Sequence, residues 1–196
     1  ILDSNIRLGA QNMNENNFGA YTGEICAAML KEFSVRYVNR RFRAPPILRL
    51  NRRARPERPV PHTPQQSSRS YGRGRNIGRT RSRTEKVLEK QVRGSLSGLT
   101  PEQMEETIIA YEPVWAIGTG KNATPQQAQE AHAFIRKLIA TMFGEAVARR
   151  VRIQYGGSVK PSNARELMSQ PDVDGALVGG ASLEARSFAE IIKNSI

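Results

Sequence analysis

The sequence predicts an α/β fold built on a parallel sheet. Short apolar runs with strand character alternate along the chain with longer segments whose apolar residues recur at helical spacing. Glycine-rich loops follow three of the predicted strands. Strands that alternate with helices favour a parallel sheet, and loops at the carboxyl ends of such strands are the usual place for ligands.

The chain divides into three segments by composition: residues 1–38, 39–83 and 84–196. In the first segment we expect a short strand over 6–11, a helix over 24–33 and a second strand that begins at Val35. The segment therefore contributes two strands and one helix to the predicted fold.

The second segment, 39–83, is rich in arginine and proline. It holds 14 arginines, no lysine and a single acid, Glu57, and six of the eleven prolines of the chain. It shows neither helical nor strand periodicity, and it is too poor in apolar residues to offset the entropy cost of ordering. We predict that it is disordered or translated out of frame.

The third segment, 84–196, resumes the alternation of helices and strands. Thr84 is a candidate N-cap for a helix that carries Val87, Leu88, Val92 and Leu96. Strands are predicted at 107–111, 151–155 and 174–178. Helices are predicted from Pro125, over 161–168 and over 183–192.

The three glycine-rich loops are residues 118–120, 156–158 and 179–180. One such loop alone is more often a simple turn. Together, at the carboxyl ends of parallel strands, their backbone N–H groups suit a phosphate. The first loop lacks the spacing of a nucleotide-binding phosphate loop.

Glu112 ends a predicted strand and precedes Pro113. From position alone, a solvated loop acid is the simpler interpretation. The functional alternative is a partly desolvated carboxylate that takes a proton from carbon.

Several long motifs carry a resemblance to one enzyme family. Residues 110–121 (AYEPVWAIGTGK), 155–159 (YGGSV) and 174–183 (DGALVGGASL) resemble the catalytic-strand and lid region and the seventh and eighth strand loops of triosephosphate isomerases. Residues 8–12 (LGAQN) and 19–24 (GAYTGE) are similar to the third strand and third loop of that family. The resemblance implies a TIM (β/α)8 barrel, here incomplete, with strands 3, 4, 6, 7 and 8 recognisable.

The resemblance also implies site roles. Glu112 would shuttle the proton between two carbons of a triose phosphate. Pro113 to Lys121 would form a lid, and Tyr155 and Ser158 would latch it. The lid would include Trp115 and Thr119, although a packed aromatic is an equal alternative for Trp115. Backbone N–H groups of four residues would bind the phosphate: Gly118, Ser158, Gly179 and Gly180.

The family needs neither metal nor organic cofactor, and we expect none here. A homodimer through the loop near Thr22 is implied. His132 is better explained as a packed or capping histidine, and Cys26 as a small apolar side chain. With one cysteine and no apolar run of membrane-spanning length, the chain is expected in the cytoplasm without a membrane partner.

Part of the family pattern is missing. The resemblance implies two strands ahead of Leu8, and an electrophilic histidine within Gly-His-Ser-Glu-Arg-Arg just after the fourth strand, where residues 39–43 carry none. However, Phe42 to Pro45 can be encoded TTC CGA GCG CCG C, and one base later the same letters give Ser-Glu-Arg-Arg. We therefore hypothesise that 39–83 is read out of frame.

Two alternative functions remain. One is an inactive remnant of the enzyme, because an acid–base partner and three strands are missing. The other, less favoured, is a nucleic-acid binder whose arginines neutralise phosphates while Tyr71 stacks on a base. The net charge of +12 comes from the second segment and does not describe the rest of the chain.

Overall fold

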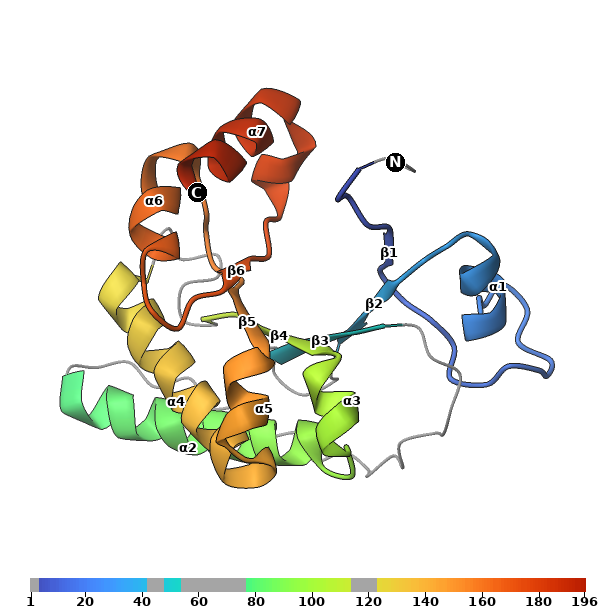
Figure 1. Ribbon diagram of the computed structural model, residues 1–196, viewed down its shortest axis with the longest axis horizontal. Helices are drawn as coiled ribbons and strands as arrows, with labels where there is room; N and C mark the ends of the chain where they lie inside the picture. Colours follow the sequence, from blue (N-terminus) through green and yellow to red (C-terminus); the bar gives the residue numbers. More distant parts are fainter. Residues whose placement is uncertain (1–3, 42–47, 54–76, 114–122) are drawn as a thin grey trace.

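The computed structural model describes residues 4–41, 48–53, 77–113 and 123–196. Within these ranges the strands form one sheet in the order β1-β2-β3-β4-β5-β6 (Figure 1). Their bounds are β1 Gly9–Ala10, β2 Tyr37–Arg41, β3 Leu48–Arg53, β4 Thr107–Tyr111, β5 Arg152–Tyr155 and β6 Gly175–Ala176. The predicted α/β class with parallel strands is therefore confirmed.

One strand departs from the predicted parallel sheet. β1 pairs parallel with β2, and β4, β5 and β6 pair parallel with one another. β3 runs antiparallel to both of its neighbours, β2 and β4, so the other five strands share one direction. Among the described residues no pairing joins β6 to β1. The sheet is open where a barrel would close.

β3 lies inside the segment 39–83, where the sequence analysis expected no strand. The strand contains no proline, and it pairs on both sides through backbone groups. A ladder between two strands needs only N–H and C=O groups, which every residue except proline supplies. A prediction that relies on side-chain periodicity therefore did not identify this strand.

The helices cover the sheet and its connections (Figure 1). The helix predicted over 161–168 is confirmed at those bounds, and the one predicted from Pro125 begins there. α2 begins at Ile77, ahead of the N-cap predicted at Thr84. Residues 77–83 contain no proline, so they can join the helix although they lack apolar periodicity. The bounds are α1 Ala27–Glu32, α2 Ile77–Leu96, α3 Pro101–Glu105, α4 Pro125–Phe143, α5 Glu145–Arg150, α6 Pro161–Met168, the 3-10 helix η2 Gly180–Leu183 and α7 Ala185–Asn194.

The main apolar core joins α2 and α4 to the strands β4 and β5. Val92 of α2, Ile135 of α4 and Ile153 of β5 are fully buried in this cluster. A smaller cluster of Leu30, Val35 and Val38 holds α1 against the start of β2. The main core therefore fixes the strands whose carboxyl ends carry the candidate site. In the described part of the chain, no helix combines the length and apolarity needed to cross a bilayer.

Candidate active site

Glu112 follows the last residue of β4, and the residue is only 7% exposed. The backbone just beyond the next strand, β5, is bonded to the residue before it. Gly156, just beyond β5, donates its N–H to the carbonyl oxygen of Tyr111 at 2.7 Å. The carboxylate is therefore held at the carboxyl end of two adjacent parallel strands, in a protected position rather than on a solvated loop.

Both glycines that follow β5 leave room for neighbouring side chains. A Cβ on Gly156 would stand 2.8 Å from Cγ of Glu112 and 3.2 Å from the carbonyl oxygen of Tyr111. A Cβ on Gly157 would overlap the ring and hydroxyl of Tyr155. The turn therefore permits Glu112 and Tyr155 to lie against the backbone of residues 156–157.

Tyr155 is the last residue of β5, and its ring is fully buried. Burial raises the pKa of its phenol, and the backbone of Ala123 lowers it by less. Within the described residues the hydroxyl has no hydrogen-bond partner of standard geometry, although Ala123 lies close enough to affect its pKa. Ala123 is the first described residue after 114–122, so Tyr155 lies beside the end of the predicted lid.

Ser158 is exposed just beyond this turn and starts the approach to α6. Its carbonyl accepts a hydrogen bond from Nδ2 of Asn163 at 3.1 Å, and Oδ1 of Asn163 accepts from the Lys160 N–H at 2.8 Å. These contacts fix the connection between β5 and α6. The side chain of Ser158 is left at the surface on the same edge of the sheet as Glu112.

Gly179 and Gly180 follow β6 and are both exposed. The strand is held by its neighbour, because the Leu177 N–H donates to the carbonyl of Tyr155 at 2.9 Å. Ser182 donates from its N–H and from Oγ to the Gly179 carbonyl, at 2.9 and 2.7 Å. A Cβ on either glycine would meet nothing within 4 Å. The turn is thus open to a ligand.

Four residues predicted for the site lie outside the described ranges: Gly118, Trp115, Thr119 and Lys121. The described ones follow β4, β5 and β6 at the same edge of the sheet. They are Glu112, Pro113, Tyr155, Ser158, Gly179 and Gly180. These residues therefore lie at the carboxyl ends of three neighbouring strands, and their roles in a site stay predictions.

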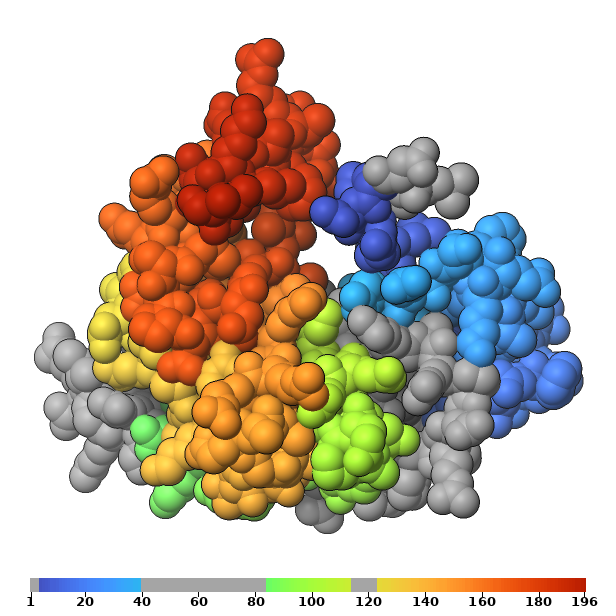
Figure 2. All heavy atoms as spheres, in the orientation of Figure 1, coloured from blue at the N-terminus to red at the C-terminus, as the bar shows by residue number. Residues whose placement is uncertain are grey.

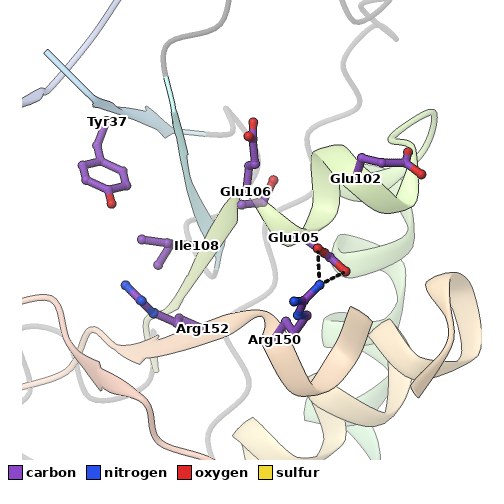
Figure 3. A pocket seen from close by; sticks show the side chains of 8 residues that line it. Tyr37, Glu102, Glu105, Glu106, Ile108, Arg150 and Arg152 are labelled. Atoms are coloured by element: carbon purple, nitrogen blue, oxygen red, sulfur yellow. Dashed lines mark hydrogen bonds and ion pairs between the residues drawn. The ribbon is translucent and has the colours of Figure 1, made fainter. Parts of the chain in front are cut away.

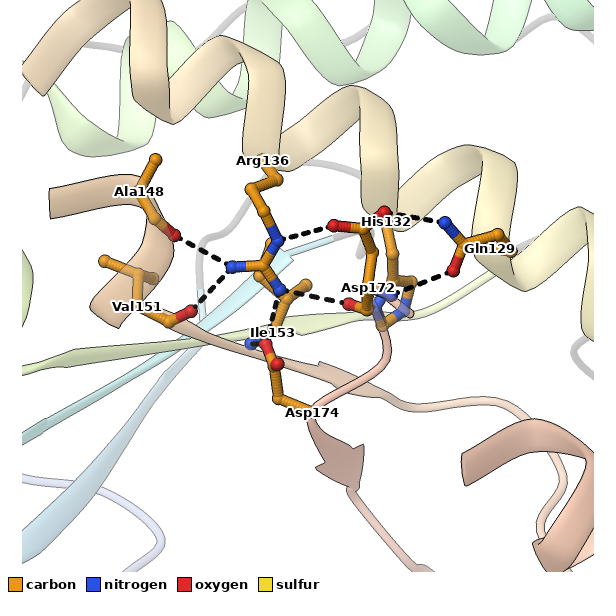
Figure 4. Close-up of polar contacts among 8 residues, drawn as sticks. All are labelled: Gln129, His132, Arg136, Ala148, Val151, Ile153, Asp172 and Asp174. Carbon is orange, nitrogen blue, oxygen red and sulfur yellow. Dashed lines mark hydrogen bonds and ion pairs between the residues drawn. The ribbon is translucent and has the colours of Figure 1, made fainter. Parts of the chain in front are cut away.

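Arg136 of α4, which no sequence pattern marked, binds the segments that lead into β5 and β6 (Figure 4). Its guanidinium donates to Asp172 Oδ1 and Asp174 Oδ2, both at 2.6 Å, and to the carbonyls of Ala148 and Val151. Desolvation by burial would lower the pKa of Arg136, but the two carboxylates together raise it. No local motif marks this residue, because its partners are separated from it in sequence.

The same network sets the position of β6 beside β5. Asp174, which precedes β6, accepts a hydrogen bond from the backbone N–H of Ile153 at 2.7 Å. Gln129 of α4 bonds Asp172 through both its amide nitrogen and its amide oxygen. Charge-assisted bonds of this kind are stronger than neutral ones. They hold the strand that carries Gly179 and Gly180.

His132 of α4 is fully buried beside the rings of Tyr111 and Tyr155. Its Nδ1 lies 3.1 Å from the carbonyl oxygen of Asp172, while Nε2 has no partner among the described residues. Burial lowers the pKa of His132 to about 4. The prediction of a packed histidine is confirmed.

A hollow of about 380 Å³ lies at the opposite ends of the strands, where β4 and β5 begin (Figure 3). Glu105 and Arg150, an ion pair at 2.9 Å, lie on its wall, and Arg152 and Tyr37 flank it. It shares none of its lining residues with the edge that carries Glu112. Within the described ranges, no group of three metal-ligating side chains is present.

Comparison with known proteins identifies the family. The family model described as triosephosphate isomerase matches residues 1–39 and 75–195. The chain belongs to the triosephosphate isomerase family. The relatives bear this out. A triosephosphate isomerase of Chloroherpeton thalassium is 49% identical over 201 residues, which cover 100% of this chain and 78% of the relative.

Two further relatives give the same result. A triosephosphate isomerase of Carboxydothermus hydrogenoformans is 49% identical over 203 residues, with 98% of this chain and 78% of the relative covered. One of Clostridium novyi is 46% identical over 200 residues, with 96% and 76% covered. Triosephosphate isomerases form (β/α)8 barrels, and the described strands form an open sheet of the corresponding α/β class.

Proposed function

We propose that this chain is an isomerase that interconverts D-glyceraldehyde 3-phosphate and dihydroxyacetone phosphate, in glycolysis and gluconeogenesis in the cytoplasm. The observation that carries the proposal is the place of Glu112. It is a buried carboxylate at the carboxyl end of β4, packed against the glycine turn that follows β5. Family membership supports the same reaction.

In the proposed mechanism, Glu112 removes a proton from the carbon next to the carbonyl and returns it to the neighbouring carbon. The intermediate between these steps is an enediolate. The position favours this role, because Glu112 is shielded from water at the end of the sheet where ligands of parallel strands bind. The same residue serves in both directions of the reaction.

The phosphate is held by backbone amides, in this proposal those of Ser158, Gly179 and Gly180, with Gly118 supplied by the lid. The turn at 179–180 is exposed and unobstructed, as an anion site requires. Pro113 to Lys121 closes over the substrate and excludes water, which protects the enediolate from losing phosphate. Trp115, Thr119 and Lys121 belong to this lid, and Tyr155 and Ser158 latch it.

A homodimer is part of the proposal. The segment around Thr22 exposes large apolar side chains, among them Phe18 (89% exposed), Tyr21, Ile25 and Met29. A second copy of the chain would remove this surface from water. Sedimentation at several concentrations tests this, and a monomer throughout the micromolar range would contradict it.

The absent histidine after β2 bears on the rate. Losing an acid–base partner costs about 10² to 10⁴-fold, so we expect turnover well below that of the longer relatives. A coupled dehydrogenase assay measures it. Near-normal turnover would contradict this expectation, whereas a complete lack of isomerisation at high enzyme concentration would favour the inactive-remnant alternative.

The role of Glu112 is tested by the substitution Glu112→Gln. We expect isomerisation to fall by about 10² to 10⁴-fold, while binding of glycerol 3-phosphate, a ligand that cannot isomerise, is retained. Glu166→Gln on the exposed side of α6 is the matched control and should leave the rate unchanged. A Glu112→Gln chain that keeps the full rate would overturn the proposal.

A further inference from the structure

The hollow of about 380 Å³ at the amino ends of β4 and β5 lies away from the edge that carries Glu112 (Figure 3). Pockets that hold small molecules usually measure about 300 to 1,000 Å³. The hollow is therefore large enough for a small ligand. Three glutamates and two arginines are among its described lining residues, so we expect a ligand for it to carry charge as well.

One charged pair of this lining is already satisfied. Nη1 of Arg150 donates to both carboxylate oxygens of Glu105, at 3.1 and 2.9 Å. This ion pair joins α5 to α3, whose atoms lie against one another on the face seen in Figure 2. The pair belongs to the wall of the hollow, so the groups that bind a ligand are to be sought among the other lining residues.

Two of these other residues carry opposite charges. Arg152 is the first residue of β5, and Glu106 lies just before β4. Within the described ranges neither side chain forms an ion pair. A ligand that enters the hollow can therefore meet one guanidinium and one carboxylate whose charges are not yet paired.

Arg152 shares its end of the hollow with an apolar and an aromatic side chain. It stands directly opposite Ile108 in the ladder of β4 and β5, and opposed residues lie on the same face of a sheet. Figure 3 shows the hydroxyl of Tyr37 and the guanidinium of Arg152 pointing towards one another beside Ile108. Both groups donate hydrogen bonds, and a guanidinium offers parallel N–H groups. A carboxylate suits the space between them.

Glu106 supplies the opposite charge close to the same space. It precedes Ile108 by two residues, which is roughly 7 Å along an extended chain, and it is partly buried. Figure 3 shows its carboxylate on the α3 side of Ile108. An ammonium group bound there would stand near a carboxylate bound by Arg152 and Tyr37.

We propose that this hollow binds a free α-amino acid with an aliphatic side chain. The carboxylate of the ligand accepts hydrogen bonds from Arg152 and from the hydroxyl of Tyr37. Its ammonium group donates to the carboxylate of Glu106. Its side chain packs against Ile108 and the ring of Tyr37. The site is separate from the proposed isomerase site and does not depend on that function.

Ligands with a single charge fit the lining less well. An anion would bring its charge towards the three glutamates of the lining, and a cation would stand near the unpaired guanidinium of Arg152. A zwitterion places each of its charges beside the opposite one. The register also sets Arg53 of β3 beside Tyr37, so an acid without an amine is included in the test.

The test is isothermal titration calorimetry of the full chain with leucine and two analogues. Isocaproate is leucine without the ammonium group, and isoamylamine is leucine without the carboxylate. We expect leucine to bind with a Kd on the order of 1 mM, as suits so small a ligand. Each analogue should bind at least about tenfold more weakly. An analogue that binds as tightly as leucine would overturn the proposal.

Matched variants assign the two charges to residues. Arg152→Gln and Glu106→Gln should each weaken leucine binding by about tenfold or more. The controls are Arg149→Gln and Glu145→Gln, which change exposed residues of α5 outside the lining and should bind as the parent does. Arg152→Gln should still bind isoamylamine as the parent does, which checks that this variant is folded. Unchanged leucine affinity in Arg152→Gln or Glu106→Gln would contradict the assignment.

A competition experiment checks where leucine binds. Glycerol 3-phosphate is the probe for the edge that carries Glu112, at the opposite ends of the strands. Leucine should bind with the same affinity in the presence of saturating glycerol 3-phosphate. If glycerol 3-phosphate displaces leucine, the amino acid occupies the Glu112 edge, and the proposed site is wrong.

Discussion

Cγ of Glu112 and the point that a Cβ on Gly156 would occupy are 2.8 Å apart. Carbon atoms in contact prefer about 3.5 to 4.0 Å, so the glutamate and any side chain at residue 156 exclude one another. The Gly156 N–H also bonds the carbonyl of Tyr111, which prevents the turn from moving aside freely. Gly156 thus positions the proposed base.

Gly156→Ala should therefore displace the Glu112 carboxylate without touching the turn at 179–180. We expect kcat to fall by about 10²-fold, the effect of a misplacement of roughly 1 Å, with KM little changed. Gly175→Ala is a matched control, because a Cβ there would make an ordinary contact, 3.6 Å from Cγ of Gln154. Steady-state kinetics of both variants check this, and equal rates would show that Gly156 does not position the base.

The start of α4 links the predicted lid to the core. Thr124 caps the helix by accepting from the Gln127 N–H at 3.2 Å, and Gln127 Oε1 accepts from the Thr124 N–H at 3.0 Å. Thr100 and Gln103 make the same capping box on α3. The two caps have the same chemistry, but only Thr124 adjoins the lid.

Thr124→Ala and Thr100→Ala should each lower the free energy of unfolding by about 1 kcal/mol, measured by urea denaturation. Only Thr124→Ala should also lower kcat, by roughly three- to tenfold, because the lid would lose its fixed end. If the two variants lose activity equally, the effect belongs to global stability and the lid does not depend on this cap.

His132 predicts a specific dependence of stability on pH. Burial lowers its pKa to about 4; the Asp172 carbonyl and the charge of Asp174 raise it by less, and Arg136 lowers it slightly. Since the unfolded side chain titrates near 6.5, the unfolded state binds more protons between these values. The stabilising contribution is complete above pH 6.5 and is lost as the pH falls towards 4.

The loss should amount to about 3 kcal/mol between pH 7 and pH 4. His132→Gln keeps an amide that can donate to the Asp172 carbonyl and removes the titration. Its free energy of unfolding should then vary less over the same range, measured by urea denaturation at each pH. Identical slopes in the two chains would show that other groups cause the acid sensitivity.

The part of the fold that the sequence predicted is the part set by local patterns. Thr124 followed by Pro125 indicated the start of α4, and the apolar run at 107–111 indicated β4, because caps and buried strands depend on adjacent residues. The glycine turns located the edge of the sheet that bears Glu112. By contrast, no local pattern shows that Arg136 would meet Asp172 and Asp174, residues more than 30 positions away.

The antiparallel direction of β3 also could not be predicted from local sequence patterns. Its ladder depends on which strands lie beside it, and its apolar–polar alternation covers only Leu48 to Asn51. β6 is shorter than the predicted strand 174–178, because the ladder ends where the chain turns towards Gly179. Residue type suggests a strand, but the neighbouring backbone decides its length and direction.

The composition of residues 39–83 leads to a prediction about the gene. The family model matches residues 1–39 and 75–195, and so leaves out 40–74, which is most of this segment. We expect fresh sequencing of the parent DNA to reveal a compensating pair of insertions or deletions that places the segment out of frame. An intact reading frame through the arginine-rich segment would contradict the hypothesis.

The same hypothesis predicts how a repaired chain behaves. Replacing residues 39–83 with the corresponding segment of the Chloroherpeton thalassium relative should restore the histidine after β2. We expect activity in the coupled assay to rise by about 10²-fold or more, because the acid–base partner returns. A glycine–serine linker of equal length is the control. If linker and native segment give the same activity, the segment does not contribute a catalytic group.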